Sequence, residues 1–273
     1  MITWHAAATA GFVFNDRPTM RLVTWNVNSL RARFAHLSRI TDEYTPDLIA
    51  LQETKVRDEE FPADDVRGLG YDVTFSGQKS YNGVAVLTRS PVSTFATALP
   101  GFETEEKRVL GVETEEFRLL NLYVPNGSSV GSEKYEFKMA WLNRLVAWIG
   151  ELSTAAKPLI VVGDFNIAPA DIDVHDPDAW HEKILCSSAE RKHLEQLLAL
   201  GFDDLYRVLN PDEPGFSWWD YRAGGFRRNH GLRIDLILTA STITTQMQTC
   251  EVLAEPRTWE KPSDHAPVCA TLG

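Results

Sequence analysis

An unbroken apolar run at residues 159–162 ends in Asp164 and Asn166, the two residues of this chain best placed by type and spacing for chemistry. The run predicts a strand buried on both faces, and Gly163 lets the backbone open into a loop. Side chains alternate along extended backbone, so a carboxylate and an amide would face solvent together while Phe165 turns into the core. An Asx turn that closes the strand would explain the same two residues, because Asp and Asn both favour turns.

Similar endings recur wherever the chain predicts a buried strand. Collected in sequence order, the polar residues at these positions are Asn26, Asn28, Glu53, Tyr123, Asn126, Asp164, Asn166, Asp235, Asp264 and His265. Each is weak evidence alone, since a strand-end Asn usually closes a turn, Glu53 could simply pair with Lys55, and an Asp-His dipeptide is often a surface loop. It is their number that favours a common polar site.

Strands and helices must interleave to bring these residues together. Helical spacing of apolar residues predicts helices that run from Leu30 to Tyr44, over residues 135–152, and from a capping box at Ser187 to Gly201. Buried strands are predicted at residues 21–25, 48–51, 81–87 after an initial turn, 117–122, 159–162 and 232–238. The core-facing tryptophans of the second helix are expected to be packing residues.

No linker-like break interrupts the chain after Met20, so residues 20–273 are expected to form a single catalytic domain. Residues 1–19 are interpreted as a disordered N-terminal extension, because they lack the basic region of a secretory signal and directly precede the first strand.

Composition places the chain among globular proteins that bury a large core, with 273 residues and 44% hydrophobic content. Cys186, Cys250 and Cys269 are odd in number and far apart, which favours neither a disulfide framework nor a zinc site. No apolar run approaches the roughly 18 residues needed to cross a bilayer. These features predict a cytoplasmic protein that does not enter a membrane.

The net charge of −11 argues weakly against a nucleic-acid partner, because phosphate binding draws on Lys and Arg. The distribution of charge matters more than the total. The stretch 221–234 contains Arg222, Arg227, Arg228 and Arg233 without any acidic residue. A local basic face is therefore predicted within an acidic chain.

Seven motifs stand in order along the chain: W-N-V-N-S-L-R, L-Q-E-T-K, Y-V-P-N-G, G-D-F-N-I-A-P, F-S-W-W-D-Y-R, N-H-G-L-R-I-D and P-S-D-H-A-P-V. From Met20 nearly to the end, they closely resemble the exonuclease III family of apurinic/apyrimidinic (AP) endonucleases. W-N-V-N, L-Q-E, G-D-F-N and S-D-H are typical of the wider endonuclease/exonuclease/phosphatase superfamily, while W-W-D-Y-R and G-L-R-I-D point to its DNA-repair branch.

This resemblance implies an α/β fold, a four-layered α/β sandwich with two mixed β-sheets packed face to face, helices outside and an active site at one rim. It implies a metal-dependent nuclease that cleaves double-stranded DNA 5′ to abasic sites. Trimming or unblocking of damaged 3′ ends, as a 3′ to 5′ exonuclease and 3′-phosphatase, is expected as well, and the protein is expected to act as a monomer.

The resemblance also assigns roles by position. Glu53 would be the main ligand of a catalytic Mg²⁺ or Mn²⁺, with Asn28 and Asp264 nearby, and a hard cation suits such oxygen donors. Asp164 would orient or deprotonate the attacking water. His265, held by Asp235, would donate to the scissile phosphate. The residues that would position the water or contact the phosphate are Asn26, Asn166, Tyr123 and Asn126. Which group takes the proton of the water stays open.

Further residues match the substrate-binding positions of the family. Trp218, Leu232 and Ile234 would wall an apolar slot for a flipped-out sugar that lacks its base, although a core role for the tryptophan is an equal alternative. Leu185 would form a rim of this slot, unless it merely packs on the helix that follows. Candidates for contacts to the DNA backbone are Arg222, Arg227, Arg228 and residues 79–81.

Three alternatives share the fold. An exonuclease-dominant enzyme with weak cleavage at abasic sites differs only in the balance of activities. The W-W-D-Y-R and G-L-R-I-D motifs, which point to the DNA-repair branch, argue against a phosphatase of lipid headgroups. A non-catalytic regulator associated with nucleic acid would not need every catalytic position filled, as it is here.

Overall fold

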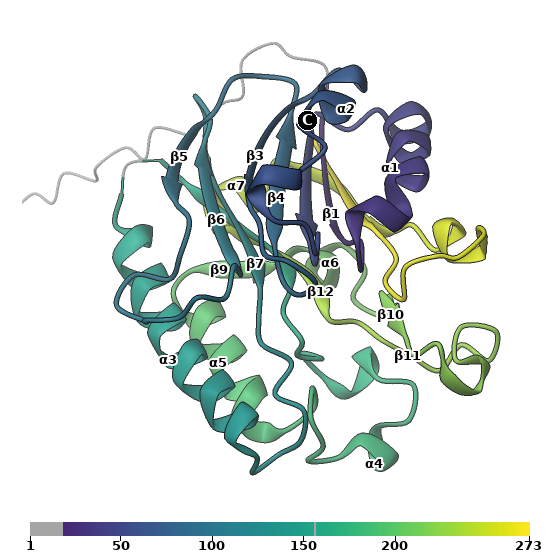
Figure 1. Ribbon diagram of the computed structural model, residues 1–273. Coiled ribbons are helices and arrows are strands. Elements are labelled where there is room, and N and C mark those ends of the chain that lie inside the picture. Colours follow the sequence, from purple (N-terminus) through teal and green to yellow (C-terminus); the bar gives the residue numbers. More distant parts are fainter. Residues whose placement is uncertain (1–18, 156) are drawn as a thin grey trace, which may run out of the picture.

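Two six-stranded sheets packed against each other form the centre of the protein (Figure 1), which we describe from a computed structural model over residues 19–155 and 157–273. The predicted N-terminal extension falls outside the described residues, apart from Thr19. In spatial order, the first sheet contains β13 (Met247–Val252), β14 (Val268–Leu272), β1 (Met20–Asn26), β2 (Leu48–Gln52), β4 (Val84–Thr88) and β3 (Asp72–Ser76). The second contains β5 (Ser93–Ala96), β6 (Val109–Glu113), β7 (Arg118–Tyr123), β8 (Leu159–Asp164), β12 (Asp235–Ala240) and β9 (Phe202–Asp204).

Each sheet contains one parallel pair of strands at its centre. β1 and β2 are parallel and are connected through helix α1 (Leu30–Tyr44), while β7 and β8 are parallel and are connected through helix α3 (Glu133–Ser153). The other neighbouring strands run antiparallel. Parallel neighbours need a crossover, which the two helices provide.

Three apolar clusters separate four layers. Between the sheets, Val86 of the first sheet packs with Leu119 and Ile160 of the second. The outer face of the second sheet is covered by α3 and α5 (Ser188–Ala199), and that of the first by α1 and α2 (Ala63–Gly68) (Figure 1). The predicted four-layered α/β sandwich is confirmed.

The helices begin and end close to their predicted positions. α1 spans Leu30–Tyr44, and Thr45 follows it in a left-handed conformation. The capping box at the start of α5 forms, with the Ser187 hydroxyl accepting from the backbone N–H of Glu190. Trp141 and Trp148 of α3 are buried, as expected for packing residues.

The prediction of one continuous strand over residues 232–238 is wrong. β11 (Gly231–Leu232) pairs with β10 (Trp218–Trp219) in a separate small sheet, and β12 begins only at Asp235. Arg233 lies in the break, only 1% exposed, and its guanidinium binds the carboxylates of Asp173 and Asp204. This arginine therefore joins the segments of Asp173 and Asp204 in the interior and does not belong to the predicted basic face.

The remaining elements are short. They are α4 (Pro177–Trp180), α6 (Leu205–Leu209), α7 (Ser241–Thr244) and the 3₁₀ turns Asp58–Glu60, Asp171–Asp173, Arg222–Gly224 and Glu255–Thr258. Within the described ranges, no helix has the length and apolar character that crossing a membrane requires.

Candidate active site

The predicted polar residues gather at one rim because of how the strands are ordered. β1, β2, β7 and β8 all direct their carboxyl ends to this rim, which places Asn26, Glu53, Tyr123 and Asp164 there. β12 runs antiparallel to β8, so its first residue, Asp235, lies directly opposite Asp164.

The loop before β14 reaches the same rim from the first sheet, because β14 is antiparallel to β1. It contains Asp264 and His265, and His265 forms an isolated β-bridge with Trp218. Polar residues from both sheets thus meet at one edge of the sandwich.

The Asx-turn alternative for the strand-end residues is confirmed, and the expectation that Asp164 and Asn166 face solvent is wrong, because they are only 1% and 4% exposed beneath the loops that meet at the rim. The Asp164 carboxylate accepts from the backbone N–H of Asn166 at 2.9 Å, and Asn26 Oδ1 accepts from the backbone N–H of Asn28 at 3.0 Å. Asn126 Oδ1 does the same with the N–H of Ser128 at 3.1 Å. These are Asx turns, and each leaves the other polar atom of the side chain free to face the site.

The amide of Asn26 joins the two carboxylates of the rim. Its Nδ2 donates to Glu53 Oε1 and to Asp164 Oδ2, both at 2.9 Å. Because both N–H groups of this amide are used, the two acidic side chains keep fixed positions relative to each other.

His265 lies between two buried acids. Its Nδ1 faces Asp235 Oδ2 at 2.8 Å, and its Nε2 lies 3.7 Å from Asp164 Oδ2. The Ser217 hydroxyl donates to Asp235 Oδ2 at 2.6 Å, which fixes the carboxylate that orients the imidazole. The nitrogen that faces Asp164 is therefore the one available to a substrate.

These contacts set the protonation states. Burial raises the pKa of Asp164 to about 7, with the nearby charge of Asp235 adding to the effect and that of His265 opposing it. Burial lowers the pKa of His265, but the carboxylates of Asp235 and Asp164 outweigh it and raise the pKa to about 10. Near neutral pH this geometry combines a protonated imidazole with a carboxyl group that can accept a proton.

Tyr123 adds a neutral hydrogen-bond donor. Burial and the neighbouring charges of Glu53 and Asp164 raise the pKa of its phenol well above the usual value, so the hydroxyl keeps its proton. Asn126 and Asn166 are joined side by side, with Asn126 Nδ2 donating to Asn166 Oδ1 at 2.9 Å.

The residues around Glu53 fit a hard divalent cation, because the candidate ligand atoms of Glu53, Asn28 and Asp264 are all oxygens. Lys55 Nζ lies 2.9 Å from Glu53 Oε2 and 2.5 Å from Asn28 Oδ1, so these two oxygens already gather around a positive charge. Asn28 Nδ2 donates to Asp264 Oδ1 at 2.8 Å, which brings the third predicted ligand to the group. Burial opposes ionisation of Glu53, yet Lys55 and Asn26 prevail and lower its pKa.

A second group also satisfies metal-ligand spacing. One ligand atom each from Asp164, Asp235 and His265 lies within 4.8 Å of the others. The ligand atoms of both groups already take part in hydrogen bonds, but this group includes an imidazole nitrogen, whereas Glu53, Asn28 and Asp264 offer oxygen atoms alone, which suit a hard cation better.

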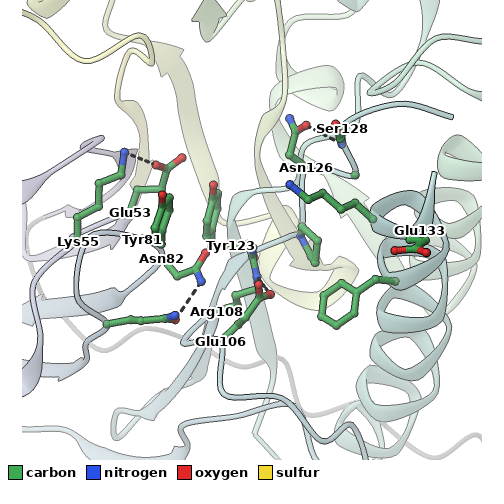
Figure 2. A pocket seen from close by; sticks show the side chains of 15 residues that line it. Glu53, Lys55, Tyr81, Asn82, Glu106, Arg108, Tyr123, Asn126, Ser128 and Glu133 are labelled. Atoms are coloured by element: carbon green, nitrogen blue, oxygen red, sulfur yellow. Dashed lines mark hydrogen bonds and ion pairs between the residues drawn. The ribbon is translucent and has the colours of Figure 1, made fainter.

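A groove of about 680 Å³ opens beside Glu53 and Tyr123 and extends to the start of α3. Figure 2 shows Glu53, Tyr81 and Tyr123 toward one end, and Asn126 and Glu133 toward the other. Lys134 and Phe137 line it as well. Tyr81, in the predicted backbone-contact segment 79–81, is 71% exposed. The groove therefore offers both aromatic and charged surface next to the polar residues of the rim.

The predicted slot residues form one apolar cluster with Leu185. Leu232 and Ile234 are buried, Leu185 is 4% exposed, and Trp218 packs against them half-buried. Trp218 Nε1 also donates to Asp264 Oδ2 at 3.1 Å, so this tryptophan connects the cluster to the polar site. Leu185 thus packs with the predicted slot residues.

The three candidate arginines lie together on the segment between β10 and β11. Arg222, Arg227 and Arg228 are all exposed. Tyr221 anchors this segment, because its hydroxyl donates to the Pro262 carbonyl at 2.7 Å. A basic surface is thereby tethered to the loop that contains Asp264.

Sequence reasoning missed several residues that hold the site. Ser217, which stands before the W-W dipeptide, binds Asp235 through its hydroxyl. Ser263 accepts from the His265 backbone N–H and donates to the Asn26 carbonyl. Arg33 donates to the carbonyls of Asn28 and Pro262. Only their presence inside or beside the recognised motifs could have indicated these roles.

Comparison with known proteins agrees with this geometry. The Endonuclease/Exonuclease/phosphatase family matches residues 23–265. Exodeoxyribonuclease III of Haemophilus influenzae is 38% identical, over 92% of this chain and 99% of the relative. The chain therefore belongs to the endonuclease/exonuclease/phosphatase family, on the branch of its exodeoxyribonuclease III relatives.

Two solved structures are particularly similar. The 3′ phosphatase NExo from Neisseria, bound to a product DNA hairpin, is 39% identical with a TM-score of 0.89, covering 93% of this chain and 99% of that one. An AP endonuclease from Archaeoglobus fulgidus is 34% identical with a TM-score of 0.88 and the same coverage.

Proposed function

We propose that this DNA-repair nuclease cleaves duplex DNA 5′ to abasic sites and trims or unblocks damaged 3′ ends. The observation that carries the proposal is the buried set of His265, Asp235 and Asp164, with the free imidazole nitrogen 3.7 Å from the Asp164 carboxylate. A phosphodiester is anionic and repels a nucleophile, so hydrolysis needs directed donors and a water activator at this spacing.

Asp164 and His265 divide the work at the phosphate. The Asp164 carboxyl, with its pKa raised to about 7, would orient the attacking water and accept its proton. The imidazolium of His265, held by Asp235, would donate to a phosphate oxygen on which charge builds. Asn166, Asn126 and the phenol of Tyr123 would supply further donors to the same phosphate.

A cation at Glu53, Asn28 and Asp264 would neutralise charge on the scissile phosphate, and we propose Mg²⁺ or Mn²⁺ because the ligand atoms are oxygens. These side chains approach from three separate segments that Asn26, Asn28 and Trp218 join through hydrogen bonds. Their own task is to hold the ligand oxygens in place before the substrate arrives.

The substrate would lie across the rim. The groove beside Tyr123 offers room for one strand, with Tyr81 exposed for stacking, and the segment with Arg222, Arg227 and Arg228 offers charge to a DNA backbone. The apolar cluster of Trp218, Leu185, Leu232 and Ile234 would receive a sugar without a base. We propose that a monomer with residues 20–273 as one domain does this work in the cytoplasm.

Labelled duplexes with an internal abasic site, a 3′-phosphate or a recessed 3′ end test the proposal directly. We expect metal-dependent cleavage of the first and removal of phosphate or nucleotides from the others. Asp164→Asn and His265→Ala should each reduce turnover about 10²-fold to 10⁴-fold, while the affinity for the duplex stays close to that of the wild type.

Hydrolysis of a phosphoinositide headgroup, with no nicking or trimming of any duplex, would overturn the proposal. If both variants lost affinity for the duplex as strongly as they lost turnover, Asp164 and His265 would act in binding DNA and not in the chemical step.

A further inference from the structure

A fully buried ion pair lies between the rim and the two outer helices of the second sheet. Lys138 of α3 and Glu190 of α5 both have 0% side-chain exposure, and Lys138 Nζ lies 2.5 Å from Glu190 Oε1. α3 and α5 lie side by side in Figure 1. No catalytic role described above uses either residue.

The remaining contacts of Lys138 all reach the rim. Its Nζ donates to the backbone carbonyl of Asn166 at 2.7 Å and to that of Asn126 at 3.2 Å. With Glu190, these acceptors account for all three N–H donors of an ammonium group. One side chain thus holds the loops that follow β7 and β8 at the same time.

Glu190 holds a third loop. Its Oε1 also accepts from the backbone N–H of Leu185 at 3.1 Å, and its Oε2 accepts from the N–H and hydroxyl of Ser187 at 3.0 and 2.6 Å. Capping α5 needs only the second oxygen. The first is left to join the Leu185 loop to Lys138.

Two of the held residues have backbones that need support. Asn166 has φ +50° and Leu185 has φ +72°. Both angles lie in the left-handed region, which residues other than glycine adopt uncommonly, Asn more readily than Leu. Such conformations persist when the surroundings over-determine them, and they cluster at functional sites. The ion pair binds the carbonyl of Asn166 and the N–H of Leu185, so it acts directly on the backbone of both residues.

Stability alone is a weak reason for this pair. Removing two charges from water is costly, and replacing a buried ion pair by apolar residues of similar size is often neutral or stabilising. Burial lowers the pKa of Lys138, which reflects this cost.

We propose that Lys138 and Glu190 are positioning residues that fix the Asn126, Asn166 and Leu185 loops relative to Asp164. The inference rests on the proposed nuclease function, because the loops matter through the phosphate and the sugar that they contact. The link to the reacting groups is short, since Asn126 donates to Asn166 and the backbone of Asn166 donates to Asp164.

The double variant Lys138→Met/Glu190→Met tests the proposal, because it removes both charges together and leaves neither ion buried without its counter-ion, while the loop groups lose the contacts under test. We expect kcat to fall by about 10 to 100-fold because the catalytic groups are slightly misplaced, while Kd for duplex DNA stays near wild type. The melting temperature should fall, because buried backbone groups lose their partners, but the variant should remain folded at the assay temperature. Backbone amides at residues 166 and 185 should exchange hydrogen at least about 10-fold faster through local opening.

Tyr135→Phe is the matched control. Tyr135 belongs to α3, and its hydroxyl lies 2.7 Å from the Ser187 hydroxyl, so the variant loses a buried hydrogen bond at the same helix interface but keeps the ion pair and its contacts with the Asn126, Asn166 and Leu185 loops. Its kcat and its exchange rates at residues 166 and 185 should remain those of the wild type.

A double variant that folds and keeps kcat and amide exchange within twofold of wild type would overturn the inference. If the double variant does not fold, the same measurements are made on Glu190→Gln, which keeps an acceptor for the α5 cap. The expected results are the same. If the wild type cleaves no DNA, yet exchange rises in the variant, the positioning role stands and the proposed function is what fails.

Discussion

Single side chains at the rim close a turn with one polar atom and contact other residues of the candidate active site with the second. Asp164 closes an Asx turn through one oxygen and presents the other to His265, and Asn26 closes a turn through Oδ1 while its Nδ2 joins Glu53 to Asp164. A turn residue is rigid because its backbone partner is only two residues away. The proposed catalytic groups on these turns are therefore held in place before a substrate arrives.

The raised pKa of Asp164 predicts the pH dependence of turnover. Below about 7 the carboxyl is protonated and cannot accept the proton of water, so kcat should rise with pH through this region. It should fall again above about 10, where His265 loses the proton that it donates. A bound cation favours the carboxylate and would move the lower limb to a lower pH. The measurement is a pH profile of kcat at saturating metal and DNA.

A profile that stays flat between pH 5 and 10, with the protein folded throughout, would argue against Asp164 as the group that accepts the proton. Chemistry must be the slow step for this comparison, which single-turnover rates establish.

Glu53→Gln should lose activity that a high concentration of Mg²⁺ or Mn²⁺ partly restores. The reason is that this carboxylate and the Asn28 amide oxygen already share the positive charge of Lys55, and an amide at position 53 would be a weaker ligand for a hard cation. Metal titrations of cleavage and of heat released on binding measure the change. Full wild-type activity in excess chelator would contradict the prediction.

Leu185→Gly should raise cleavage at internal abasic sites relative to trimming of 3′ ends. Leu185 packs with Trp218, Leu232 and Ile234, so its loss opens space for a flipped-out sugar, whereas a frayed 3′ end is already free to bend. Glycine also tolerates φ +72°, which keeps the loop in place.

The matched comparison is Leu185→Ala, which opens similar space but keeps the strained backbone. An unchanged ratio of the two activities in Leu185→Gly, at wild-type thermal stability, would return Leu185 to a packing role.

At the scale of elements, the site depends on loops that are tied to one another. The segment between β10 and β11 is anchored by the Tyr221 hydroxyl at Pro262, and Arg33 donates to both the Pro262 and Asn28 carbonyls. The basic segment, the Asp264 loop and the Asn28 turn are thereby coupled. We expect a displacement of one of these loops to displace the other two.

Arg227→Ala with Arg228→Ala should weaken binding to duplex DNA and flatten its dependence on salt, with little effect on kcat. Both side chains are exposed and lie outside the catalytic group. Each phosphate contact adds about 0.9 to the slope of log K against log salt, so up to about two contacts should disappear.

Binding isotherms at several salt concentrations measure this slope. Arg67→Ala is the control, because Arg67 is equally exposed but belongs to α2 on the outer layer. The same loss of slope in the control would mean that the Arg227 and Arg228 segment has no special place in binding.

At the scale of the whole molecule, the two sheets share one apolar layer. Residues of both, such as Val86 and Ile160, belong to the same cluster, so neither half can expose its inner face and stay folded. We therefore predict a single cooperative unfolding transition for residues 20–273. Ile160→Ala should lower the stability by about 2 to 5 kcal/mol while the transition stays single.

Calorimetry measures both effects, since equal calorimetric and van't Hoff enthalpies identify two-state unfolding. Two separate transitions would show that the sheets fold as independent units.

Local pattern determined much of this protein. The periods of apolar residues placed α1, α3, α5 and the central strands, because burial of one helix face or of both strand faces leaves a regular trace in the sequence. The capping box at Ser187 and the end of α1 before Pro46 follow from backbone chemistry that is equally local. The motifs also named the rim residues. Asn26, Glu53, Tyr123 and Asp164 follow predicted strands, whereas the place of Asp235 at the start of β12 came only from the structure.

Only the tertiary structure decided what required contacts between distant segments. Arg233 looked like part of a basic face and is instead buried against Asp173 and Asp204, 60 and 29 positions away in the chain. Glu190 looked like a helix cap and also binds Lys138, 52 residues away. A side chain can serve a local partner and a remote one at once, and sequence spacing reveals only the local one. The remote partner is set by the order of strands in two packed sheets, which no single stretch of the sequence contains.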